Sequence, residues 1–147
     1  MAAFTGDKPF ITGIAALASG RPAEALECFR IEVEANGSPV ASSYLAYCLA
    51  RQNGTYRDSI SRCMEALKEE PRAPEIFLNL GRIYILSGHK RSALRSFQLG
   101  LRYGKNAEIN HELKRLGHRK RPPFTFLPRN HVINKYMGKI LSRIHLR

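Results

Sequence analysis

Three glycines, Gly20, Gly54 and Gly88, lie 34 residues apart along the chain. Glycine readily adopts the left-handed conformation that ends a helix, so evenly spaced glycines indicate evenly spaced turns. A period of roughly 20–50 residues is typical of proteins built from one repeated structural unit. Aligned on these glycines, the chain divides into three segments: residues 6–39, 40–73 and 74–107.

The third segment has the clearest helical pattern. Its apolar residues recur at the spacing of one face of an α-helix, in two groups on either side of Gly88. These residues are Phe77, Leu80 and Tyr84, then Ala93, Leu94, Phe97 and Leu101. The pattern predicts two helices joined by a turn. Because Gly81 and Ala93 have little or no side chain, we expect the two helices to approach closely there.

The third segment resembles the tetratricopeptide repeat, a unit of two antiparallel helices. The matching residues are Phe77, Asn79, Leu80, Gly81, Tyr84, Ala93, Phe97 and Gly100. The resemblance implies an all-α fold, a right-handed superhelical stack of helix pairs. It also implies a non-enzymatic module, a scaffold or adaptor that binds another protein or peptide.

The first two segments match the repeat less well. The first keeps Gly13, Gly20, Ala25 and Phe29 but departs from the pattern at Pro9, Thr12 and Glu32. The second keeps Gly54, Ala66, Leu67 and Pro71. There Tyr47 stands at the glycine position, beside the small residues Ser43 and Ala46. We interpret this as an exchange of volume that preserves the total size of the core.

Residues 108–147 differ from the repeats. A helix over residues 107–116 is predicted to cap the exposed face of the last repeat. Pro122, Pro123 and Pro128 then indicate an extended strip. Residues 134–146 have the pattern of a basic amphipathic helix. We expect residues 122–146 to pack on the array through their apolar side chains.

Positive charge is concentrated near the C-terminus. Residues 1–101 carry a net charge of +2, whereas residues 102–147 carry +10. This asymmetry suggests an anionic partner. The candidate contacts are Arg119, Lys120, Arg121, Lys135, Lys139 and Arg143. The alternatives are a solvated face, an acidic protein or membrane surface, and a nucleic acid, whose binding would depend steeply on salt.

No sequence motif indicates catalysis, a metal or a cofactor. There is no phosphate-binding glycine loop, and the histidines lack the close cysteine or carboxylate partners of a zinc site. The three cysteines are odd in number and have no CxxC spacing, which argues against a disulfide framework. With no secretory signal and no apolar run of membrane-spanning length, we expect a cytoplasmic protein.

In the tetratricopeptide family, fixed positions of each first helix line a concave groove. In this chain they form an apolar wall with two arginines, which suits a peptide or helix with hydrophobic anchors. The candidate contacts are Phe10, Ile14, Leu17, Tyr44, Arg51, Gln52, Leu78, Arg82 and Ile85. Chaperone-binding relatives carry a carboxylate clamp, but Phe10 and Ile14 occupy two of its positions here. The alternative occupant of the groove is the chain's own tail. A homo-oligomer is a further candidate assembly.

Overall fold

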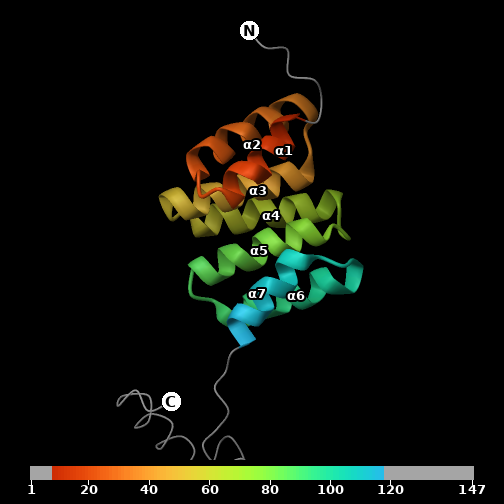
Figure 1. Ribbon diagram of the computed structural model, residues 1–147. Coiled ribbons are helices and arrows are strands. Elements are labelled where there is room, and N and C mark those ends of the chain that lie inside the picture. Colours follow the sequence, from red (N-terminus) through yellow and green to blue (C-terminus); the bar gives the residue numbers. More distant parts are fainter. Residues whose placement is uncertain (1–7, 118–147) are drawn as a thin grey trace, which may run out of the picture. The chain divides into compact units, whose positions relative to one another are not determined.

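The computed structural model describes residues 8–117, and every regular element in this range is an α-helix (Figure 1). The helices in chain order are α1 (Lys8–Ala18), α2 (Pro22–Asn36), α3 (Pro39–Asn53), α4 (Tyr56–Glu69), α5 (Pro74–Leu86), α6 (Lys90–Tyr103) and α7 (Ala107–Gly117). The predicted all-α, helical-repeat fold is confirmed.

The first six helices form three antiparallel pairs, each joined by a short turn with a left-handed glycine. Gly20, Gly54 and Gly88 have φ angles of 71°, 68° and 80°. Any other residue would be strained in this conformation. Figure 1 shows the pairs α1/α2, α3/α4 and α5/α6 stacked in chain order. The 34-residue glycine period is therefore the period of the helix pairs.

Proline and serine begin several of the helices. Pro22, Pro39 and Pro74 each lie in the first turn of α2, α3 and α5, where the missing N–H has no intrahelical partner. The Ser38 hydroxyl caps α3 by accepting a hydrogen bond from the Ala41 N–H at 3.3 Å. Local sequence thus sets where each pair starts.

A glycine on the first helix of a pair lies against a phenylalanine on the second. A Cβ atom added at Gly13 would lie 2.8 Å from Cε1 of Phe29, and one added at Gly81 would lie 2.7 Å from Cδ1 of Phe97. Both phenylalanines are fully buried. The missing side chains therefore make room for the rings, as expected for Gly81.

The second pair reverses this arrangement. Tyr47 and Cys63 occupy the two equivalent positions, and both contribute to one apolar cluster between α3, α4 and α5. In this pair the aromatic residue is on the first helix and the small residue is on the second, the opposite of the other two pairs. The predicted exchange of volume therefore includes Cys63 beside Ser43 and Ala46, and it stays a prediction.

A buried polar contact links the second and third pairs. Asn79 on α5 is 0% exposed and donates a hydrogen bond from Nδ2 to the Ser43 hydroxyl on α3 at 2.9 Å. The Ser43 hydroxyl in turn donates to the Val40 carbonyl at 2.7 Å. Because both residues are buried, this contact fixes how α3 and α5 align.

The helix after the repeats, α7, packs through Ile109, which is 0% exposed. A Cβ atom added at Gly100 on α6 would lie 2.7 Å from Cδ1 of Ile109. The Ile109 N–H donates to the side-chain oxygen of Asn106 at 3.0 Å, which caps the start of α7. This helix corresponds to the one predicted over residues 107–116.

The proline-rich strip, the basic amphipathic helix and the packing of residues 122–146 lie outside the described residues and stay predictions. Within residues 8–117, no helix has the length and apolar character needed to cross a bilayer.

The buried cysteines give a prediction about reactivity. Burial raises the pKa of Cys48 to about 11 and that of Cys63 to about 12, above an ordinary value of 9.0. Burial, with the nearby Glu24 and Glu27, also raises the pKa of Cys28, but this thiol is only half-buried. Because the reagent must reach a thiolate, we expect Ellman's reagent at pH 8 to modify Cys28 slowly in the native protein and the other two only after unfolding.

The raised pKa values of Cys48 and Cys63 also make the stability of the fold depend on pH. The folded state holds these thiol protons more tightly than the unfolded state, so their contribution to stability is complete below about pH 9 and falls as the pH rises towards 11 to 12. Unfolding in urea at pH 8 and pH 10.5 measures this loss. In the labelling experiment, rapid modification of Cys63 by Ellman's reagent in the native protein would contradict its placement in the core.

Candidate functional site

The predicted groove residues fall into rows, because equivalent positions of α1, α3 and α5 recur every 34 residues. The first row lies in the core. Tyr44 is 3% exposed, Leu78 is 0% exposed and Phe10 is half-buried. Burial also raises the pKa of the Tyr44 hydroxyl above its ordinary value. Tyr44 and Leu78 therefore belong to the core and not to a ligand-facing surface, which corrects their assignment as contacts.

Aromatic packing explains the burial of this row. The ring of Phe29 stacks on Tyr44 with a centroid distance of 5.0 Å. The edge of Phe10 contacts both rings, with centroid distances of 5.8 Å to Phe29 and 5.6 Å to Tyr44. The three rings join α1, α2 and α3, so the positions that line a groove in the family form an inter-helix core here.

The second row contains Ile14, which is half-buried, and Arg82, whose charge is already paired. The Arg82 guanidinium lies 2.6 Å from a Glu108 carboxylate oxygen and 3.1 Å from one of Glu112, both on α7. It also lies 5.4 Å from the centre of the Tyr47 ring. Arg82 therefore ties α7 to α5 and is not a free cation for a ligand.

The environment of Arg82 keeps it charged. Burial lowers the pKa of the guanidinium, but hydrogen bonding and attraction to Glu108 outweigh this effect, so the net pKa is raised above its ordinary value. The Arg82 side chain is 16% exposed and that of Glu112 is 8% exposed, so water screens this pair only weakly. The contact between Arg82 and α7 is therefore structural.

The third row is the accessible one. Leu17 and Ile85 are half-buried, whereas Arg51 and the adjacent Gln52 are exposed. These residues lie at the C-terminal ends of α1, α3 and α5, next to the turns. Leu17, Arg51 and Ile85 share one position of the repeat, and Gln52 follows Arg51 directly.

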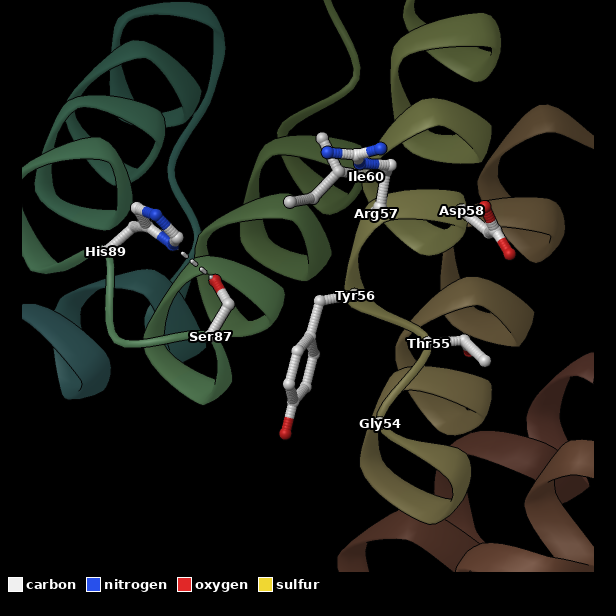
Figure 2. A pocket seen from close by; sticks show the side chains of 8 residues that line it. All are labelled: Gly54, Thr55, Tyr56, Arg57, Asp58, Ile60, Ser87 and His89. Atoms are coloured by element: carbon white, nitrogen blue, oxygen red, sulfur yellow. Dashed lines mark hydrogen bonds between the residues drawn. The ribbon is translucent and has the colours of Figure 1, made fainter.

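A cavity of about 520 Å³ lies next to the C-terminal end of α3, between the α3–α4 turn and the α5–α6 turn (Figure 2). It is lined by Gly54, Thr55, Tyr56, Arg57, Asp58, Ile60, Ser87 and His89. Figure 2 shows Tyr56 and Ile60 on the side that faces Ser87 and His89, and Asp58 on the far side of α4. The cavity begins two residues after Gln52, where α3 ends.

The cavity walls combine apolar surface with one cationic and one anionic residue, Arg57 and Asp58, and the Asp58 side chain lies on the far side of α4. Tyr56 and Ile60 are half-buried and pack against the core between α3, α4 and α5. The exposed Arg57 adds a guanidinium. Such a lining suits an apolar side chain with a neighbouring acidic group.

Ser87 and His89 hold the α5–α6 turn. The Ser87 hydroxyl and Nδ1 of His89 are hydrogen-bonded at 2.9 Å, and the Ser87 hydroxyl also lies 3.2 Å from the Tyr84 carbonyl. The imidazole packs edge-on against Tyr84, with ring centres 6.3 Å apart. These local contacts indicate that the hydrogen-bonded Ser87 and His89 stabilise the α5–α6 turn.

Sequence reasoning missed Tyr56, Ile60 and His89 as lining residues. Their only signal in the sequence is closeness to the turn glycines, Gly54 and Gly88. The predicted anionic-partner residues, from Arg119 to Arg143, lie outside the described part of the chain. Within residues 8–117, no group of three His, Cys, Asp or Glu side chains could hold a metal ion.

The stacked helix pairs have counterparts among solved structures. The first tetratricopeptide-repeat domain of human RPAP3 aligns with a TM-score of 0.58 and 18% sequence identity, over 74% of this chain and 87% of that one. The tetratricopeptide-repeat domain of P58(IPK) aligns at 0.56 and 14% identity, over 78% of this chain and 35% of that one.

A third structure contains a bound peptide. The second tetratricopeptide-repeat domain of human RPAP3, in complex with the HSP70 peptide SGPTIEEVD, aligns with a TM-score of 0.53 and 17% identity. The alignment covers 78% of this chain and all of that one. No protein-family model and no curated protein matches the sequence. By its structure, this chain has the fold of a tetratricopeptide-repeat domain.

Proposed function

We propose that the protein is a non-enzymatic interaction module that binds a segment of another protein. The binding surface is formed by the accessible row, Leu17, Arg51 and Ile85 with Gln52, and by the cavity in Figure 2. The observation that carries the proposal is that this cavity adjoins the exposed end of α3. The peptide-bound tetratricopeptide-repeat domain supports the idea that such a fold serves as a docking surface.

The chemistry of this surface suggests what the partner segment contains. Tyr56 and Ile60 offer a place for one apolar side chain. Arg51 and Arg57 are both exposed and lie on either side of the α3–α4 turn. An apolar anchor next to an acidic residue would satisfy both features, because charge complementarity adds selectivity to apolar burial.

The test is an affinity purification of the full chain after nuclease treatment, with quantitative mass spectrometry of bound proteins. We expect Arg51→Glu to reduce recovery of the specific partner about tenfold, the range of an exposed interfacial charge reversal. Arg95→Glu is the matched control, since Arg95 is an exposed arginine on α6. If the wild type and both variants recover the partner protein equally, the end of α3 does not belong to the binding surface.

A second candidate function rests on the net charge of +10 over residues 102–147. In this alternative, the basic C-terminal third binds a nucleic acid or another anionic surface. The same purification separates the two functions. Recovery that disappears after nuclease treatment, and falls steeply with added salt, would favour the nucleic-acid alternative.

A further inference from the structure

Glu32 is a buried carboxylate at a position that is small in the other repeats. The equivalent residues of the second and third pairs are Ala66 and Gly100. Helices approach closely there, since a Cβ atom added at Gly100 would lie 3.0 Å from Cβ of Phe77. Glu32 is nevertheless only 7% exposed. The first pair must therefore have additional space at this position.

The first pair also lacks two aromatic rings that the third pair has near this position. In the third pair, Phe77 stacks on Tyr103 with a centroid distance of 5.6 Å. The residues at these positions in the first pair are Pro9 and Ala35, so proline and alanine replace two aromatic rings. A cavity of about 420 Å³ lies at this end of the first pair. It is lined by Phe10, Ile11, Glu32, Ser38 and Val40.

Only one of the two oxygens of the Glu32 carboxylate, which lines this cavity, has a hydrogen-bond partner within the described residues. Oε1 of Glu32 accepts a hydrogen bond from the Asn36 amide at 2.8 Å. Oε2 is buried and has no hydrogen-bond partner within the described residues. A buried charged oxygen without a partner is costly, and none of the five lining residues carries a positive charge.

We propose that this cavity binds the ammonium group of a lysine side chain from a partner protein. The free Oε2 of Glu32 accepts the ammonium, and the Ser38 hydroxyl supplies a second oxygen. Phe10, Ile11 and Val40 surround the four-carbon stem, which prefers apolar surface, and the Phe10 ring attracts the cation. Ile11 is 64% exposed, so the lining reaches the protein surface.

Two features select lysine over arginine. A guanidinium binds best to two parallel acceptor oxygens, but Asn36 already occupies one oxygen of Glu32. An ammonium is a compact charge with three donors and can use a single free oxygen together with a hydroxyl. The site lies on α1, α2 and the start of α3, apart from the cavity between the α3–α4 and α5–α6 turns. The lysine site can therefore be tested independently of the proposed peptide-binding surface.

The test is a titration of the full chain with Nα-acetyl-lysine methylamide, followed by amide chemical shifts. We expect saturable shifts at Phe10, Ile11, Ser38 and Val40. The same compound acetylated on Nε, which has no charge, is expected to bind at least tenfold more weakly. This comparison needs no mutation, so it cannot be confused with misfolding.

Variants test the role of the carboxylate. Glu32→Gln keeps the shape and removes the charge, and we expect at least a tenfold loss of affinity for the lysine compound. Glu34→Gln is the matched control, because Glu34 is an exposed glutamate on the same helix. Equal binding of the charged and neutral compounds, or unchanged binding by Glu32→Gln, would overturn the proposal.

The chain's own lysines are the competing occupants. If the wild type does not bind the compound but a variant with Lys120, Lys135 and Lys139 replaced by glutamine does, the site serves an internal segment. That result would overturn the assignment to a partner protein.

Discussion

Replacing Gly81 by leucine is expected to destabilise the protein by about 3 kcal/mol. The new Cβ atom alone would lie 2.7 Å from Cδ1 and 2.8 Å from Cζ of Phe97, a ring that is fully buried. Overpacking of this kind costs roughly 1–3 kcal/mol and sometimes more. Leucine favours helix over glycine by about 1 kcal/mol, but it adds three further carbons at the same contact. Urea unfolding measures the difference.

The second repeat supplies an internal control for this prediction. There, tyrosine and cysteine occupy the positions of Gly81 and Phe97. If the two positions compensate in volume, the double variant Gly81→Tyr, Phe97→Cys should be more stable than Gly81→Tyr alone, with a coupling of about 1 kcal/mol or more. Wild-type stability of Gly81→Leu, or strict additivity in the double variant, would mean that these positions do not face each other.

Replacing Arg82 by methionine is expected to cost about 3 kcal/mol, since it removes two charge-assisted hydrogen bonds, to Glu108 and Glu112, from a mostly buried side chain. The Glu112 side chain is 8% exposed and accepts from Arg82 at 3.1 Å. Methionine fills similar apolar space but offers no donor. A fall in the melting temperature of the order of 10 °C would accompany this loss.

Glu108→Gln is the matched control for the Arg82 variant. Its side chain is 51% exposed, and an exposed ion pair contributes about 0–1 kcal/mol. We therefore expect a large loss of stability for Arg82→Met and a small one for Glu108→Gln. Equally small losses would show that Arg82 does not tie α7 to α5, and Arg82 would return as a candidate ligand contact.

The fold was predictable because its main determinants are local and periodic. Gly20, Gly54 and Gly88 each adopt the positive φ angle that their spacing indicated. Gly81 lies against Phe97, as its small size required. Turn conformation and close helix contact depend on residue size and sequence position, so one near-ideal repeat was enough to align two weaker ones.

The site was less predictable because burial depends on neighbouring repeats. Tyr44 lies at a groove position of its own repeat, yet it stacks on Phe29 from the preceding pair. Arg82 is paired with α7, about one repeat further along the chain. The Glu32 cavity is lined by residues of α1, α2 and the start of α3, which come together only when the helices are assembled. No single segment contains this information.

Photo-crosslinking from the end of α3 tests most directly whether this chain is a protein-binding module. Benzoylphenylalanine in place of Gln52 would report contacts of the proposed surface, and the same residue in place of Gln98, which is exposed on α6, is the control. We expect a discrete protein adduct from position 52 in cells that resists nuclease, is absent from position 98 and is lost with Arg51→Glu. Adducts only to nucleic acid, or the same protein adducts from both positions, would contradict it.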